Sequence, residues 1–103
     1  MARFVQIIEF QTSRIEEVRA LADAMSAQRE SGTARRVTVT SDRDRPGFYL
    51  TAAEFESYES AMENSQRPDT QEFSAKMAEL CDGPPRFYNL DVVFEWDAAS
   101  TTK

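Results

Sequence analysis

Four stretches of the chain have patterns of apolar and polar residues that are typical of β-strands. The stretches cover residues 4–10, 35–40, 48–53 and 87–96. In the first stretch, Phe4, Ile8 and Phe10 fall on one face of the strand, whereas Val5 and Ile7 fall on the other. Because both faces are partly apolar, we expect this strand to be covered on both sides.

A first helix is predicted between the first two strands. Ser13 stands three residues before Glu16, which is the spacing of a capping box, and Ser31-Gly32 is a suitable end. The apolar residues between these signals recur at helical spacing, at Ile15, Val18, Leu21, Ala22 and Met25. The pattern predicts a surface helix with one apolar stripe.

A second helical region follows the third strand, and the sequence divides it into two pieces. The first piece is expected from Glu54 to Asn64, and Arg67-Pro68 interrupts the pattern. A second piece is expected from Asp69, which has capping spacing to Glu72. The run Asp82-Gly83-Pro84-Pro85 ends the region.

The last strand has two alternating sets of side chains. We expect the more apolar set to face the core: Tyr88, Leu90, Val92, Phe94 and Trp96. The other set is half polar, as expected for a lining that meets water or a ligand: Phe87, Asn89, Asp91, Val93 and Glu95.

This order of strands and helices predicts one α+β domain with a four-stranded antiparallel sheet over residues 1–97, followed by a flexible tail at 98–103. Helices on one face of such a sheet leave the other face uncovered. We expect a second copy of the chain to cover it, so that the protein is a homodimer through its sheet face.

Composition excludes several kinds of chemistry. The 103 residues include no histidine, so histidine-based triads, an axial haem histidine and histidine-bound metals are excluded. Cys81 is the only cysteine, which rules out an internal disulfide, and we expect it to be a small buried residue. The acidic residues are dispersed along the chain, so we expect no metal and no cofactor.

Charge and hydropathy limit the partners. The net charge of −6 opposes nucleic-acid binding. No window has the ~18 apolar residues of a membrane span, and the start of the chain lacks the pattern of a signal peptide. We therefore expect a cytoplasmic protein that binds neither nucleic acid nor membrane.

The chain resembles the dimeric α/β-barrel superfamily, and in particular proteins similar to antibiotic biosynthesis monooxygenases. The resemblance rests on the opening strand Val5-Gln6-Ile7-Ile8-Glu9-Phe10, on the segment Glu54-Phe55-Glu56-Ser57-Tyr58-Glu59-Ser60-Ala61-Met62, on the broken second helix and on the strand Phe87-Tyr88-Asn89-Leu90-Asp91-Val92. It implies a ferredoxin-like βαββαβ fold in which two subunits pack sheet against sheet around a small-molecule cavity.

The resemblance also implies a function. Members include cofactor-independent oxygenases, lactone isomerases and proteins without known activity. We therefore expect a small-molecule-binding protein that oxidises or isomerises an aromatic or polyketide-like substrate without metal or flavin. The alternative is a non-catalytic ligand-binding or structural homodimer, and a regulatory amino-acid-binding domain is a third interpretation.

Six residues are candidates for binding a small hydrophobic or aromatic ligand, and no catalytic residue is assigned. They are Gln6, Arg36, Tyr49, Tyr88, Asn89 and Trp96. The tyrosines and Gln6 offer hydrogen bonds to a carbonyl or phenolate, and Arg36 offers a charge to an anion. The oxygenase members are associated with a cavity asparagine, tryptophan, and histidine or tyrosine. In this chain Gln6 is the polar residue nearest to the expected asparagine, and the only tryptophan, Trp96, falls at the end of the last strand.

Overall fold

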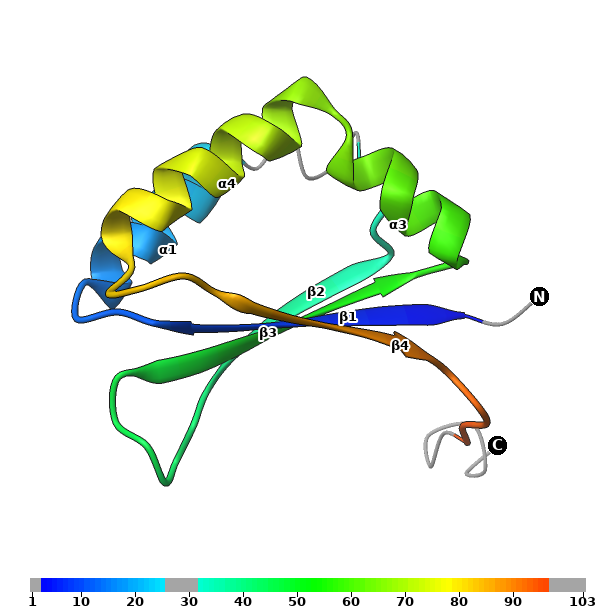
Figure 1. The fold of residues 1–103 in the computed structure, drawn as a ribbon, viewed down its shortest axis with the longest axis horizontal. Coiled ribbons are helices and arrows are strands. Elements are labelled where there is room, and N and C mark those ends of the chain that lie inside the picture. Colours follow the sequence, from blue (N-terminus) through cyan, green and yellow to red (C-terminus); the bar gives the residue numbers. More distant parts are fainter. Residues whose placement is uncertain (1–2, 26–31, 97–103) are drawn as a thin grey trace.

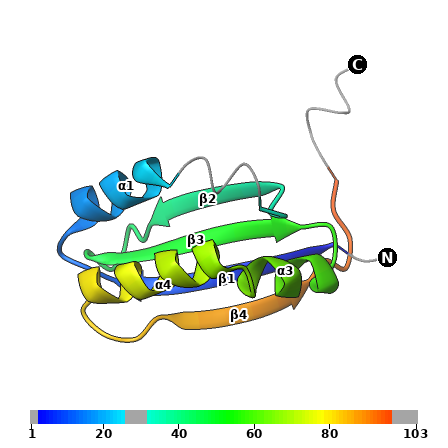
Figure 2. The same cartoon turned by 90° about the horizontal axis from the view of Figure 1, so that it is seen from above.

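A computed structural model of the protein describes residues 3–25 and 32–96 (Figure 1). Its elements are β1 (Phe4–Gln11), α1 (Ile15–Ala24), β2 (Arg36–Ser41), β3 (Phe48–Phe55), α3 (Tyr58–Ser65), α4 (Pro68–Leu80) and β4 (Arg86–Asp91). The sheet has the order β2-β3-β1-β4, and every neighbouring pair is antiparallel. The helices all lie on one side of the sheet (Figures 1 and 2). The predicted α+β, ferredoxin-like fold is confirmed.

Strand β1 lies inside the sheet and sets the orientation of its neighbours. Gln6 is directly opposite Ala53 of β3 and Asn89 of β4. Side chains in register lie on the same face, so these three residues share the face that also carries buried Phe4 and Phe10. This is the face toward the helices.

The opposite face has no helix over it, and we call it the free face. Its residues follow from the register: Val5, Ile7, Glu9 and Gln11 of β1, Arg36, Thr38 and Thr40 of β2, Phe48, Leu50, Ala52 and Glu54 of β3, and Arg86, Tyr88 and Leu90 of β4. The centre of this surface is apolar, while its charged residues lie toward the ends.

The helices contact the sheet mainly near its two ends. At one end Phe4, Ala53, Phe55 and Ala61 form a buried cluster, and Tyr58 of α3 meets the Phe4 ring edge-on at 5.4 Å between ring centres. At the other end Phe10, Val18 and Met25 are buried. Helix α4 buries none of its residues, so the middle of the sheet is only loosely covered.

Thr12 joins four elements at the second end. Its hydroxyl donates a hydrogen bond to the Leu80 carbonyl at 2.6 Å and accepts one from the Arg14 amide at 3.0 Å. Its own amide donates to the carbonyl of Gly47, which has a φ of +89° that favours glycine. Thr12 is buried and ties the end of β1 to the β2–β3 turn, to α4 and to the start of α1.

Three helix boundaries differ from the sequence prediction. Helix α1 begins at Ile15 after Arg14 rather than after a Ser13 cap, because the Thr12 hydroxyl binds the Arg14 amide. Strand β3 continues to Phe55, so the helix predicted from Glu54 begins at Tyr58, where the Ser57 hydroxyl accepts a hydrogen bond from the Ser60 amide. The α3–α4 break is confirmed, although the cap of α4 is Arg67 with Pro68 in the first turn, not Asp69.

The end of α1 is also earlier than predicted. The helix ends at Ala24 with Met25 as its cap. Ser31, one of the two residues of the predicted end, lies outside the described residues.

The prediction for the last strand was wrong in length and in orientation. Strand β4 ends at Asp91 because it pairs only with β1, whose first residue Phe4 is opposite Asp91. Tyr88 and Leu90 lie on the free face, and Phe94 and Trp96 lie beyond the strand with 80% and 78% of their surfaces exposed. The alternation was read correctly, but the more apolar set does not face the core of this chain.

We predict that Thr12→Val destabilises the fold by about 1–3 kcal/mol, because the substitution keeps the side-chain shape while leaving partly buried hydrogen-bonding groups of Arg14 and Leu80 unpaired. Urea unfolding followed by circular dichroism measures this. Thr70→Val is the matched control in the first turn of α4, and we expect it to change stability by less than about 0.5 kcal/mol. Equal effects of the two substitutions would contradict the assigned role.

Candidate functional site

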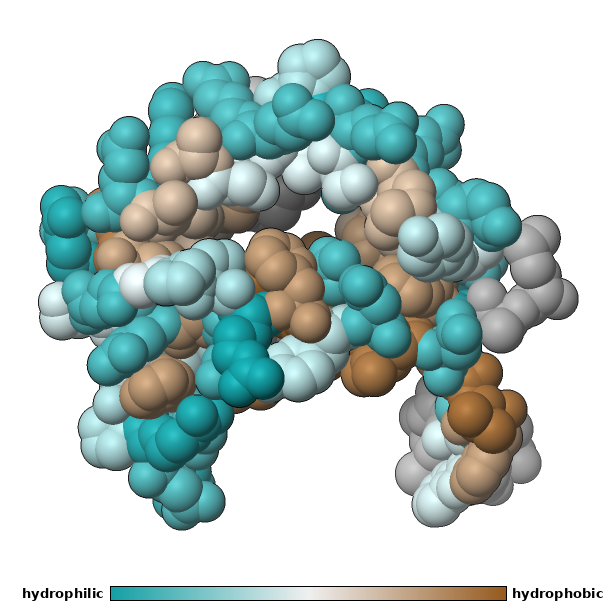
Figure 3. Space-filling view, viewed as in Figure 1, coloured by the Kyte–Doolittle hydropathy of each residue, from teal (hydrophilic) through white to brown (hydrophobic). Residues whose placement is uncertain are grey.

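A hollow lies between the helices and the middle of the sheet. Helices α3 and α4 form an arch that is highest at their junction (Figure 1). The space-filling view shows an opening beneath this arch (Figure 3). The hollow follows from the packing, because buried side chains join the helices to the sheet near its ends while α4 buries none. Proline at the start of α4 helps to separate the two helical pieces.

The sheet beneath the arch carries a pair of amides. The Gln6 Nε2 group donates a hydrogen bond to Asn89 Oδ1 at 3.0 Å across the β1–β4 pair. Among the described residues no further hydrogen bond of these two side chains is present, so Asn89 retains N–H donors for another partner. The neighbouring helix-facing residues are Ile8 and its cross-strand partner Phe87, which is 56% exposed. An amide pair bordered by apolar surface suits a flat molecule with a carbonyl or phenol oxygen.

A depression of about 490 Å³ lies along α3, where that helix meets the sheet. It is lined by Tyr58, Glu59, Met62, Glu63 and Gln66. Tyr58 is half exposed and rests against Phe4, while Met62 packs on the buried cluster. The depression therefore combines apolar surface next to the core with carboxylates at its border.

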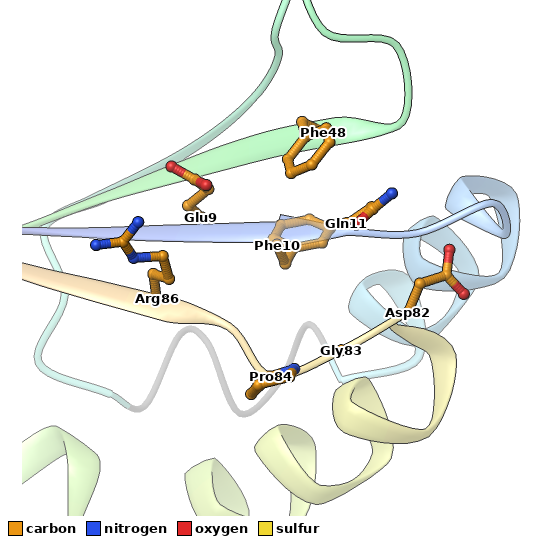
Figure 4. A pocket seen from close by; sticks show the side chains of 8 residues that line it. All are labelled: Glu9, Phe10, Gln11, Phe48, Asp82, Gly83, Pro84 and Arg86. Carbon is orange, nitrogen blue, oxygen red and sulfur yellow. The ribbon is translucent and has the colours of Figure 1, made fainter.

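A smaller cavity of about 130 Å³ lies at the other end of the sheet (Figure 4). Its lining includes Glu9, Phe48 and Arg86, whose side chains point to the free-face side in Figure 4, and it extends to Asp82-Gly83-Pro84. Acidic and basic groups are both present in this small volume. A cavity lined by groups of both charges shows no preference for an anionic or a cationic ligand.

Hydrogen bonds and ion pairs link Glu9 to the β2–β3 turn and to β4. The Glu9 carboxylate accepts a long hydrogen bond from the Tyr88 hydroxyl at 3.5 Å and forms an ion pair with Arg45 at 3.4 Å. Arg45 also binds Asp42 at 2.8 Å and lies over the Phe48 ring at 4.4 Å. The hydrogen bond from Arg45 lowers the pKa of the Asp42 carboxyl, and the bond from Asp42 raises the pKa of the Arg45 guanidinium. These groups are satisfied by one another, which favours a structural role.

The six sequence-predicted candidates do not form one site in this chain. Gln6, Tyr49 and Asn89 lie on the helix-facing side, where Gln6 contacts Asn89 and Tyr49 stacks on Phe10 with ring centres 5.6 Å apart.

The other three candidates lie elsewhere. Arg36 of β2 and Tyr88 of β4 are on the free face. Trp96 follows the end of β4. Residues of the free face cannot reach a ligand under the arch because the sheet lies between them.

Sequence reasoning placed Phe87 in the set expected to line a ligand site but did not name it as a candidate, and it assigned Tyr88 and Leu90 to the core face. The signal that could have corrected this was Gln6: its cross-strand position required a polar partner, and only the Phe87–Asn89 set supplies one. Met62 and Tyr58 were recognised only as helical apolar residues.

The described part of the chain gives little support for a metal site, a reactive thiol or a membrane-spanning helix. Over residues 3–25 and 32–96 no group of three or more acidic, histidine or cysteine side chains is arranged to hold a metal ion. Cys81 is partly buried, and this burial together with Asp82 raises the pKa of its thiol, so that it is protonated at neutral pH. None of the described helices has the length and apolar character needed to cross a membrane.

Comparison with known proteins identifies similar folds but no sequence relatives. No family model matches the chain, and no curated protein matches it. Among solved structures, a candidate antibiotic biosynthesis monooxygenase from Caulobacter crescentus superposes with a TM-score of 0.78 at 13% identity, over 90% of this chain and 92% of that one. A cofactor-independent oxygenase from Streptomyces nogalater, SnoaB, gives a TM-score of 0.76 at 12% identity, over 90% and 95% of the two chains.

A third similar structure is a protein from Mycobacterium tuberculosis, with a TM-score of 0.75 at 21% identity over 92% of this chain and 99% of that one. At such low identities the matches establish a shared architecture rather than a shared reaction. The resemblance predicted from the sequence is thus confirmed at the level of the fold: the chain has the fold of antibiotic biosynthesis monooxygenase-like proteins.

Proposed function

We propose that the protein binds a flat aromatic or polyketide-like molecule beneath the α3–α4 arch and oxygenates it without metal or flavin. The observation that carries the proposal is the Gln6–Asn89 amide pair, which lies beside apolar, partly exposed surface on the helix-facing side of the sheet. Two further findings support it: the opening beneath the arch (Figure 3) and the fold shared with SnoaB, which is described as a cofactor-independent oxygenase.

The amides act by orientation and by hydrogen bonding. Asn89 N–H groups donate to the substrate oxygen that becomes negatively charged when the substrate ionises, and Gln6 fixes the Asn89 side chain through the 3.0 Å hydrogen bond. Phe87 and Ile8 offer apolar contact to the rings of the substrate. Neither amide is basic enough at neutral pH to remove a proton from the substrate, so the substrate must itself be acidic.

The reaction balances for a hydroxylated anthrone, whose ring CH₂ group lies between two aromatic rings. Loss of one proton from this CH₂ group gives a carbanion whose charge spreads onto the carbonyl oxygen. The carbanion reduces O₂ and forms a carbon–oxygen bond to it. Loss of the second hydrogen and cleavage of the oxygen–oxygen bond give a quinone carbonyl and one molecule of water. Both oxygen atoms of O₂ are thereby accounted for, and O₂ is the only oxidant.

The second candidate function is ligand binding without turnover. One observation favours it: the two amides under the arch supply hydrogen bonds but no general base. Stoichiometric binding of the anthrone under air, with neither O₂ uptake nor quinone formation, would support this alternative.

We further propose that the protein is a homodimer joined through the free face, in the cytoplasm as expected from the sequence. The apolar centre of the free face supports this, because Val5, Ile7 and Leu50 have no covering element among the described residues. Its charges are balanced, with Glu9 opposite Arg86 and Glu54 opposite Arg36, although the chain as a whole is acidic. A charged surface that binds a copy of itself is self-complementary when it carries both signs of charge.

For ligand turnover, we predict that Asn89→Leu lowers the rate of anthrone oxidation about 10²-fold, because one donor to the developing oxyanion is lost. Gln6→Leu should also lower the rate, because Gln6 holds the Asn89 side chain in its orientation. Oxygen uptake and the absorbance of the quinone measure the rate.

Gln71→Leu is the matched control for this experiment, since it removes an exposed amide from α4. It should leave the rate unchanged. Full activity of both site variants would contradict the assignment of the amide pair.

For assembly, we predict that the protein sediments as a dimer at tens of micromolar and that Leu50→Asp makes it monomeric, because the charge would be buried in the apolar centre of the interface. Val39→Asp, on the neighbouring strand but on the helix-facing side, is the control and should remain dimeric. Analytical ultracentrifugation distinguishes the species, and a monomeric wild-type protein would overturn the dimer.

A further inference from the structure

Two cross-strand rows of side chains form the floor beneath the arch. Each row crosses the sheet from β2 through β3 and β1 to β4, and all of its members lie on the helix-facing side. In that order the rows are Val37, Ala53, Gln6 and Asn89, and beside them Val39, Thr51, Ile8 and Phe87. Neighbouring strands lie about 4.8 Å apart, so each row is about 14 Å long.

Aromatic side chains border this floor at both ends of the strands. On one side the ring centres of Phe4 and Phe55 are 6.4 Å apart, and on the other side Phe10 and Tyr49 stack at 5.6 Å. Phe4, Phe55 and Phe10 are buried, so the space above them is filled. A long ligand on the floor therefore lies across the strands, because the aromatic groups close the space along them.

The floor is open at both edges of the sheet. Phe87 at the β4 edge is 56% exposed, while Val37 and Val39 at the β2 edge are 46% and 54% exposed. Figure 2 shows β4 and β2 at opposite edges of the sheet. Figure 3 looks along the rows, from the β4 edge toward the β2 edge, and shows the opening beneath the arch. We call the space above the two rows the channel.

The two ends of the channel differ in polarity. The end over β1 and β4 holds the Gln6–Asn89 amide pair, with its hydrogen bond of 3.0 Å. The end over β2 presents Val37 and Val39, and neither row contains a charged residue. A ligand that matches both ends has a hydrogen-bonding head and an apolar tail.

We propose that the ligand carries an unbranched alkyl chain, which extends from its aromatic head along the channel to Val37 and Val39. This inference rests on the head site of the proposed function and adds the rest of the ligand to it. The head lies over Phe87 and Ile8, next to the amides. The chain crosses Thr51 and meets the valines two strand spacings, or about 10 Å, from β1.

An alkyl chain suits the β2 end of the channel better than further fused rings do. Val37 and Val39 have no hydrogen-bonding side-chain groups, so contact with them is gained by displacing water from apolar surface. A sheet of four strands is twisted, and a flexible chain follows this twist where a rigid planar ring system does not.

Alkyl esters of para-hydroxybenzoic acid test the channel without any turnover. Each ester has a flat phenol head with a carbonyl oxygen, and only the length of its chain changes along the series from methyl to heptyl. Isothermal titration calorimetry measures the dissociation constants. We expect the dissociation constant to fall about threefold for each added CH₂ group, because each group is buried against apolar surface.

The variant Val39→Asp distinguishes the channel from non-specific binding of the longer esters. It should weaken binding of the heptyl ester about tenfold or more relative to the methyl ester, because the chain would meet a charge. Ser41→Asp is the matched control: it places the same charge on the same face of β2, but opposite Tyr49 and outside the two rows. Both dissociation constants should be unchanged in this control, and circular dichroism establishes that both variants are folded.

The outcomes separate the channel from the head site on which it rests. Asn89→Leu should weaken the methyl and heptyl esters by the same factor, because both have the same head. If it does so while chain length or Val39→Asp has no effect, the head site stands and the channel is overturned. If no ester binds, both are overturned. A clear dependence on chain length without any anthrone oxidation would support the channel and overturn only the oxygenation.

Discussion

The antiparallel pairing of β1 with β3 and β4 is the interaction on which the rest of the structure depends. A strand bonded on both edges fixes the register of both neighbours, and a shift of one residue would move every side chain to the other face. The observed register places Phe4 and Phe10 under the helices and leaves Val5 and Ile7 on the free face. It also puts Gln6 next to Asn89. Two separate surfaces, one for a ligand and one for a partner, thus originate in one strand.

The helical layer explains why there is space above the sheet. In a well-filled α+β domain, helices bury a continuous apolar stripe along the sheet. Here the buried residues form groups at the ends, around Phe55 and around Phe10, and the second helical region is broken at Pro68 between them. A gap in the core costs stability, because dispersion contacts are lost. A protein that retains such a gap under polar amides is suited to bind a molecule that fills it.

Each of the two proposed interactions would stabilise the folded chain. Sheet-to-sheet association would cover the free face, while a ligand under the arch would join the helices to the sheet where α4 buries nothing. Each partner binds only the folded chain, so each would raise its stability by mass action. The hydrogen bonds of Thr12 connect the end of β1 with the β2–β3 turn and with α4.

The sequence by itself determined the element order, the antiparallel α+β fold, the break before Pro68 and the two-sided apolar character of β1, because these follow from periodicity and backbone chemistry that act over a few residues. Only the tertiary structure decided which face of β4 meets the helices. Alternation shows only that β4 has two faces. Tyr88 and Leu90 would be apolar whether they faced a core or a partner. The pairing of Asn89 with Gln6 is what assigns one face of β4 to the helix-facing side and the other to the free face. For the same reason the sheet separates five of the six candidate residues into two surfaces, and Trp96 lies beyond β4. The grouping depends on cross-strand register, which involves residues more than 80 positions apart along the chain.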